Sequence, residues 1–95
     1  MARVLLTPLA ESDLEAIWLT VALDNPTAAD RLLARIGEKL ERLGDFPDMG
    51  APRPELAPGA RLLVEGSYLV LYETMNDGVL VVRVVHGARD LTDLI

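Results

Sequence analysis

The feature that most constrains this chain is a β-hairpin pattern in its last third. Two runs of apolar, β-branched and aromatic residues, 68–72 and 79–85, flank the turn sequence Asn76-Asp77-Gly78. Asp and Gly tolerate the positive φ angles that a tight turn requires, so this arrangement is a strong signal for a hairpin. The second run ends at His86, the only histidine in the protein. A titratable ring is therefore expected at the end of a strand.

Two helices are expected before the hairpin. Thr7-Pro8 and Asn25-Pro26 each place a capping side chain before a proline, which suits the first helical position. Apolar residues then recur at helical spacing, and Trp18 lies on the first stripe, where we expect it in the core. The second stripe ends at Gly44, which is expected to terminate the helix as a left-handed residue. So few residues join the helices that they must form an antiparallel hairpin.

The remaining segments complete an α+β fold in a single domain spanning residues 1–95. The expected strands are residues 4–6, 60–65, 68–75 and 79–86. Residues 45–59 hold four of the six prolines and are expected to form an extended loop. The short connections at Gly66-Ser67 and Asp77-Gly78 force antiparallel neighbours. The predicted order is β-α-α-β-β-β, a helical hairpin packed on a small antiparallel sheet.

The register of the strands decides which side chains share a face. If both connections are two-residue turns, Arg61 and Arg83 each lie opposite Tyr72, on the face away from the core. A three-residue turn at 76–78 would instead place Arg83 among core leucines, which desolvates a charge without evident return. We therefore expect the first register. One face would then carry Arg61, Glu65, Tyr68, Tyr72 and Arg83, and the core face Leu62, Val64, Leu69, Leu71, Leu80, Val82 and Val84.

Charge and composition narrow the function. Fifteen acidic residues against nine basic ones give a net charge of −6, which opposes binding to nucleic-acid phosphates. There is no cysteine, hence no disulfide and no thiolate metal site, and we expect neither a metal nor a cofactor. No apolar run approaches the roughly 20 residues of a membrane span, and the first residues are too weakly apolar for a secretion signal. A cytoplasmic protein without membrane contact is expected.

The chain has more apolar residues than so small a domain can bury. They make up 51% of the sequence, and residues 79–85 are apolar on both faces of the expected strand. Such a strand is typically covered on both sides. The helices cover one side, and we expect a partner on the other, because large exposed apolar patches mark interaction sites.

Five short motifs resemble, in this order, those of one family. They are Ala10-x-x-Asp13-Leu14-x-x-Ile17-Trp18, Asn25-Pro26-x-x-Ala29, Leu43-Gly44-x-Phe46-Pro47-x-x-Gly50, Tyr68-x-Val70-x-Tyr72 and Arg83-Val84-x-His86-Gly87-x-Arg89-Asp90. With the order of elements, they resemble the ParE branch of the RelE/ParE toxin superfamily over nearly the whole chain. The resemblance implies the toxin of a type II toxin-antitoxin system, neutralised by a wrapping ParD-type antitoxin. The complex would be a hetero-oligomer, expected as a heterotetramer, that meets operator DNA only through the antitoxin.

The face away from the core is where the resemblance puts the antitoxin or the target. The residues expected to bind there are Arg61, Tyr68, Val70, Tyr72, Val81, Arg83, Val85 and Arg89. Antitoxin leucines would pack on the three valines and its carboxylates would pair with Arg61 and Arg83. For Arg89-Asp90 there is an alternative, an ion pair that anchors the C-terminus.

Three functions remain open. ParE-like toxins with a known target generally inhibit DNA gyrase, whereas RelE-like relatives cleave ribosome-bound mRNA, and a non-toxic binding module in a repressor complex is a third possibility. A ribonuclease would require Arg61, Arg83 and either His86 or Tyr72 to converge. Such enzymes use clustered basic residues, but this chain is acidic and has one lysine. A protein-binding inhibitor is therefore favoured over an enzyme. His86 is expected to cap the strand end, facing away from both arginines, and no catalytic residue is assigned.

Overall fold

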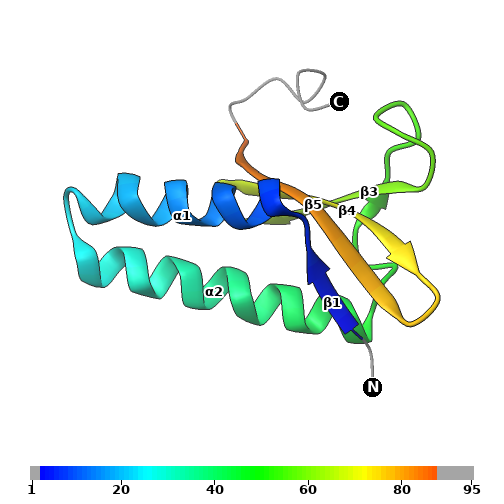
Figure 1. The fold of residues 1–95 in the computed structure, drawn as a ribbon, viewed down its shortest axis with the longest axis horizontal. Coiled ribbons are helices and arrows are strands. Elements are labelled where there is room, and N and C mark those ends of the chain that lie inside the picture. The colour runs from blue at the N-terminus through cyan, green and yellow to red at the C-terminus, as the bar shows by residue number, and fades with distance from the viewer. Residues whose placement is uncertain (1–2, 88–95) are drawn as a thin grey trace.

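Two antiparallel helices lie against one face of a five-stranded sheet in the computed structural model, which describes residues 3–87 (Figure 1). The elements are β1 (Arg3–Leu6), α1 (Pro8–Ala22), α2 (Pro26–Asp45), β2 (Ala51–Pro52), β3 (Ala60–Glu65), β4 (Tyr68–Met75) and β5 (Gly78–His86). The predicted α+β architecture is confirmed. Two details extend it, because β1 joins β5 in parallel and the short strand β2 forms within the expected loop. Among residues 3–87, no helix is both long and apolar enough to span a bilayer.

Both helices begin where the capping pattern predicted. The Thr7 hydroxyl accepts a hydrogen bond of 3.1 Å from the backbone N–H of Ala10. The Asn25 side-chain oxygen accepts one of 3.0 Å from the N–H of Ala28. In each case a proline follows the cap, so its missing N–H leaves no helical hydrogen bond unmade. These local interactions explain why the helix starts are readable from the sequence.

Two expectations about the helices are wrong. Gly44 does not end α2, because its φ angle is not positive and the helix keeps its last hydrogen bond, from the N–H of Phe46 to the carbonyl of Arg42 at 2.9 Å. Trp18 is only half-buried and lies outside the main core. Its indole N–H donates to the carboxylate of Asp30 on α2 at 2.8 Å. This residue therefore links the two helices at their surface.

The predicted register is correct between β3 and β4, where Arg61 lies opposite Tyr72. At the next connection the turn residues are Asn76 and Asp77, and Gly78 already belongs to β5. Gly78 lies beside Arg3 of β1, so closely that an added Cβ would overlap the Arg3 carbonyl oxygen. Only glycine allows β1 to pair with β5 at this point.

Between β4 and β5 the predicted register is wrong. Tyr72 lies opposite Val81 rather than Arg83, and a β-bulge then shifts the ladder by one residue, so that Leu71 lies opposite Arg83. Val82 is the residue left without a cross-strand partner. Near the turn, Tyr72 thus pairs two residues earlier on β5 than predicted, and beyond the bulge the ladder follows the register that a three-residue turn would have given.

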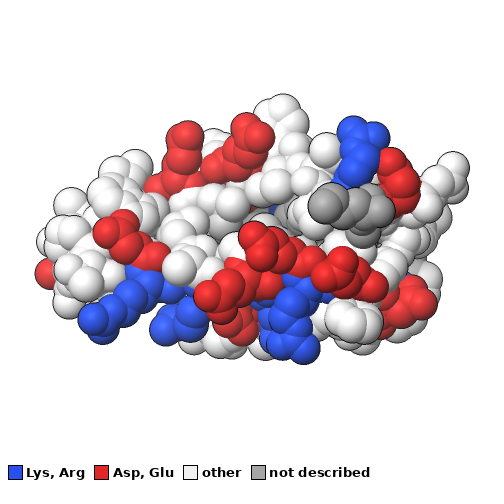
Figure 2. All heavy atoms as spheres, turned by 90° about the horizontal axis from the view of Figure 1, so that it is seen from below, with Lys and Arg blue, Asp and Glu red and all other residues white. Residues whose placement is uncertain are grey.

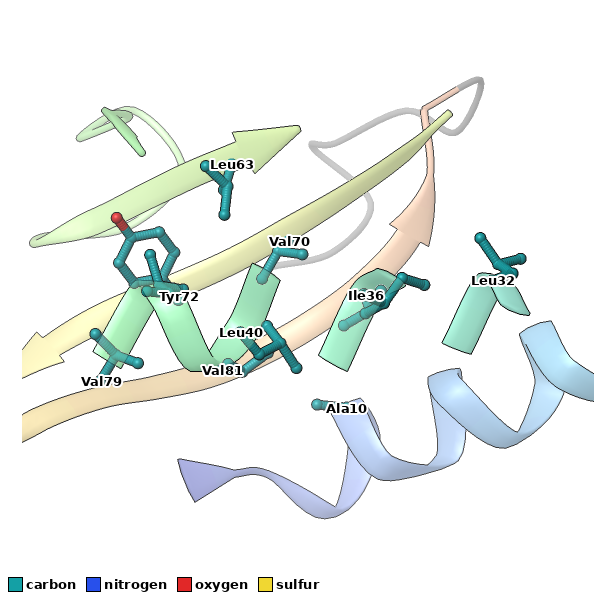
Figure 3. Close-up of a cluster of buried hydrophobic side chains, with 11 residues drawn as sticks. Ala10, Leu32, Ile36, Leu40, Leu63, Val70, Tyr72, Val79 and Val81 are labelled. Atoms are coloured by element: carbon teal, nitrogen blue, oxygen red, sulfur yellow. The ribbon is translucent and has the colours of Figure 1, made fainter. Parts of the chain in front are cut away.

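This register reverses the predicted faces of the sheet. The helices cover the side carrying Leu63, Val70, Tyr72, Val79, Val81 and Val84, which form the main core with Ala10, Leu32, Ile36, Leu40 and Leu43 (Figure 3). Of the residues expected in the core, Val84 belongs to it because it follows the bulge. Leu62, Leu71 and Val82 instead point to the other side, where the loop residues Leu56 and Ala57 pack on them. We call this second side of the sheet the outer face.

Candidate functional site

Arg83 connects β5 to α1 instead of facing a partner. Its Nε and Nη2 atoms donate to the two carboxylate oxygens of Asp13 at 2.8 and 2.9 Å. Asp13 also accepts the backbone N–H of Val84 at 3.0 Å, and the Thr7 hydroxyl donates to the carbonyl of Val82 at 2.8 Å. The hydrogen bond to Asp13 raises the pKa of Arg83. Because the two charged side chains are only 15% and 14% exposed, the pair is a structural clamp at the bulge.

Arg61 is also engaged within the chain. Its guanidinium donates to the carbonyl of Gly50 at 2.7 Å and to that of Asp48 at 3.3 Å. The Asp48 carboxylate lies 3.5 Å away, and the Arg61 side chain is 24% exposed. Arg61 therefore anchors the loop after α2 on β3. Its guanidinium is already bonded within the chain, which argues against the predicted role of Arg61 in binding antitoxin carboxylates.

Tyr72 is buried and organises the same loop. Its hydroxyl accepts the N–H of Gly50 at 2.8 Å and donates to the carbonyl of Pro47 at 2.6 Å. A Cβ added at Gly50 would lie 2.7 Å from the tyrosine ring, so no larger residue fits there. Burial raises the pKa of Tyr72 above its ordinary value. The motif from Pro47 to Gly50 is thus explained by this anchor.

The valines expected to receive a partner have almost no accessible surface. Val70 and Val81 are fully buried beneath the helices, and Val85 is 4% exposed. The expectation that they form an open face is wrong, because the bulge and the turn at 76–77 orient β5 differently. Tyr68 remains half-buried at the edge of the core. Arg89 and Asp90 lie outside the described residues.

His86 lies away from Arg61 and Arg83. It pairs with Tyr68, and the two rings stand edge to face with centroids 5.4 Å apart. Through this pairing His86 shares the face of Tyr72 and its neighbour Arg61, contrary to the expected orientation. The two tyrosines nevertheless lie four positions apart on β4, which is about 13 Å along a strand. A hollow of about 320 Å³ beside the His86 ring is lined by Ala16, Ile17, Thr20 and Tyr68.

The outer face is an apolar surface that the described residues 3–87 cover only in part. Its apolar members by strand pairing include Leu5, Leu62, Val64, Leu69, Leu71, Leu80 and Val85, and Val82 at the bulge packs with them. Val64 is 57% exposed and Leu5 37% exposed, and the loop with Leu56 covers only the middle. The sequence correctly indicated that β5 is apolar on both sides. It assigned the wrong side to the helices.

Neither a metal centre nor a continuous basic surface on α2 is found among the described residues. Residues 3–87 contain no group of three His, Asp or Glu side chains that could hold a metal ion. Figure 2 shows the face formed by α2, where basic side chains lie among acidic ones. These include Arg31, Arg35, Glu38, Glu41 and Arg42, all exposed. Interleaved charges weaken attraction to a phosphate backbone.

Comparison with known proteins agrees with this fold. The model of the family described as "ParE toxin of type II toxin-antitoxin system, parDE" matches residues 4–91. The toxin ParE1 of Mycobacterium tuberculosis is 33% identical over 95% of this chain and 94% of its own. For ParE3 of Caulobacter vibrioides the identity is 32% over 96% and 92%, and for toxin RelE2 of that bacterium 33% over 94% and 99%.

A solved structure described as the chromosomal ParDE TA system from P. aeruginosa is similar with a TM-score of 0.76. The identity is 26%, and the match covers 90% of this chain and 96% of that one. The resemblance found in the motifs is therefore confirmed, and the chain belongs to the ParE toxin family of type II toxin-antitoxin systems.

Proposed function

We propose that this protein is a toxin neutralised by a ParD-type antitoxin and directed at DNA gyrase. The observation that carries the proposal is its membership of the ParE family together with an apolar outer face that residues 3–87 cover only in the middle. An inhibitor of this kind acts by binding, so it requires an accessible protein-binding surface and no catalytic group. The proposed target also implies that the protein acts in the cytoplasm.

The outer face is the proposed docking surface for the antitoxin. Val64 and Leu5 expose apolar area next to the half-buried Leu69 and Leu80. Burying such a surface is the main driving force of association. A wrapping antitoxin segment is expected to bury more than about 1,200 Å² in total, the range of stable interfaces. We propose a heterotetramer in which the antitoxin alone contacts operator DNA.

A ribosome-dependent ribonuclease is the second candidate, favoured by the match to a RelE toxin. The geometry of the described residues speaks against it. Arg83 is clamped by Asp13, Arg61 is held by two backbone carbonyls, and His86 stands about 13 Å further along the sheet. General acid-base catalysis needs such groups within hydrogen-bond reach of one reacting atom. A non-toxic binding module is the third candidate and shares the docking surface.

Expression of the chain alone separates these functions. Filamentation with DNA damage is the expected result, whereas an early loss of translation would favour the ribonuclease and normal growth the non-toxic module. Inhibition of supercoiling by purified gyrase in the presence of the protein tests the target directly.

The antitoxin surface is tested by co-purification with a ParD-type antitoxin. Val64→Asp is expected to abolish the complex, because it places a charge on the apolar docking surface. Phe46→Asp is the matched control, since Phe46 is 60% exposed, much like Val64, and lies in the loop after α2. Equal loss in both variants, or in neither, would contradict the proposed surface.

A further inference from the structure

Helix α1 is apolar on two sides. The inner side packs on the main core through Ala10, Leu14, Ile17 and Val21. The outer side consists of Leu9, Ser12, Ala16, Leu19 and Leu23, all of them exposed. Leu9 and Leu19 are each 60% exposed and Leu23 is 88% exposed. A surface helix of a globular protein normally has a polar outer side, so these leucines require an explanation.

The outer residues of α1 follow the spacing of a coiled-coil seam. Their separations are three, four, three and four positions, which is the a and d pattern of a heptad repeat. The small residues Ser12 and Ala16 stand in the middle of the seam and the leucines towards its ends. The turn after α1, which includes Leu23, projects beyond the strands (Figure 1). A second helix can therefore lie along this seam.

The charges that α1 itself contributes are all negative, and one of them, Asp13, is paired with Arg83 of β5. Residues 8–22 contain no lysine or arginine, and the exposed Glu11 and Glu15 lie next to the seam. Glu15, Trp18 and Leu19 line a hollow of about 310 Å³. The carboxylate of Asp30, bonded to the Trp18 indole, adds a further negative charge at this place. An apolar wall, an aromatic ring and a carboxylate together suit the long stem and charged end of Lys or Arg.

We propose that the outer side of α1 binds an amphipathic helix of a partner protein whose apolar seam is flanked by lysine or arginine. Partner leucines would pack against Leu9, Leu19 and Leu23, and one basic side chain would enter the hollow between Glu15 and Trp18. This interface goes beyond the proposed antitoxin surface, because it lies on the helical layer and not on the outer face of the sheet.

The charges argue against two other occupants. In a symmetric dimer through α1, the row of Glu11 and Glu15 would face the same row of the second copy, which is repulsive. A helix that lies on a membrane surface normally carries basic residues on its polar side, and this helix carries acidic ones. A basic amphipathic helix of another protein would cover the apolar seam and pair with the acidic residues beside it.

The test uses the full-length protein and a synthetic helical peptide without tryptophan. The peptide has leucine at a and d and lysine or arginine at e and g, and a second peptide has glutamate at e and g instead. Trp18 is the only tryptophan of the chain, so its fluorescence reports on the hollow. We expect saturable binding of the basic peptide, weakened by salt, and at least tenfold weaker binding of the acidic one.

Matched variants locate the interface. Leu19→Ser is expected to weaken binding of the basic peptide by about tenfold or more, since it removes a leucine that the peptide would bury. Phe46→Ser, at the same 60% exposure outside the seam, should leave it unchanged. Glu15→Lys should exchange the preference in favour of the acidic peptide.

Three outcomes would overturn the proposal. These are an unchanged Trp18 signal, equal binding of both peptides, and concentration-dependent dimerisation that Leu19→Ser abolishes. Val64→Asp, which probes the antitoxin surface, should leave the peptide titration unaffected, so the two interfaces can fail independently.

Discussion

Replacing Arg83 with alanine is expected to destabilise the fold more than it weakens partner binding. The change removes both guanidinium hydrogen bonds from the Asp13 carboxylate, which is only 14% exposed. Breaking one member of a buried pair typically costs about 3–5 kcal/mol. Because both side chains keep some solvent contact, we expect the lower end, about 3 kcal/mol. In a domain of this size that corresponds to a fall in Tm of roughly 12–24 °C.

Urea denaturation followed by circular dichroism measures this effect in a double-mutant cycle. Asp13→Ala and Arg83→Ala combined are expected to cost much less than the sum of the single changes, with a coupling of about 2–3 kcal/mol. Arg53→Ala is the control, because its ion pair with Glu55 is 35% and 59% exposed and should contribute less than about 1 kcal/mol. The hydrogen bond to Asp13 raises the pKa of Arg83, so the guanidinium stays charged throughout the pH range used for folding experiments.

The opposite pattern would refute this reasoning. If Arg83→Ala left the free energy of unfolding within about 0.5 kcal/mol of the wild type, the value typical of surface changes, while antitoxin affinity fell, Arg83 would face the partner. The register predicted from the sequence, with Arg83 opposite Tyr72 on the face away from the helices, would then be the correct one.

Three further predictions follow from particular contacts. Tyr72→Phe should cost about 1–3 kcal/mol in urea denaturation, because two buried backbone groups lose their partner. Burial raises the pKa of Tyr72, so the phenol of the unfolded chain loses its proton at a lower pH than that of the folded protein. The free energy of unfolding of the wild type should therefore fall as the pH rises through about 10. The same pH dependence in Tyr72→Phe would contradict this. Gly78→Ala should destabilise far more than Gly59→Ala, since both residues have positive φ angles but only Gly78 touches the Arg3 backbone; equal melting temperatures would exclude that contact. His86→Gln should leave growth inhibition intact, whereas loss of a ribosome-dependent mRNA cleavage activity would restore the ribonuclease.

The elements were predictable because local interactions determine them. The helix starts depend on Thr7 and Asn25 acting within three residues, and the hairpins depend on short turns. The end of α2 was predicted wrongly because glycine allows a left-handed residue that ends a helix but does not require one, and Gly44 stays helical. Trp18 was misjudged because helical spacing does not show that Asp30 of the next helix offers its indole a hydrogen-bond acceptor.

The predicted register between β4 and β5 is wrong because of a residue that is distant in the sequence. Arg83 was not expected opposite Leu71, because desolvating an unpaired charge is costly. Asp13 removes that cost from 70 residues away, and its second hydrogen bond, to Val84, stabilises the backbone beyond the bulge. Both residues belong to the motifs that carried the family resemblance. An ion pair assumed between Asp13 of the first helix and Arg83 of the last strand would have allowed the bulge to be predicted.

The motif residues explain the fold better than they explain the choice of partner. Val70, Tyr72 and Gly50 are buried, and Asp13 and Arg83 are mostly enclosed by their own pair. The exposed apolar residues fall between the motifs, on two different layers. They are Leu5 and Val64 on the sheet, and Leu9, Leu19 and the C-cap residue Leu23 on the helical layer; Phe46, which is exposed within the third motif, is the exception. Changes in the motifs should therefore alter stability first, whereas changes in these residues should alter binding at constant stability. A set of variants sorted in this way separates folding from recognition in this toxin family member.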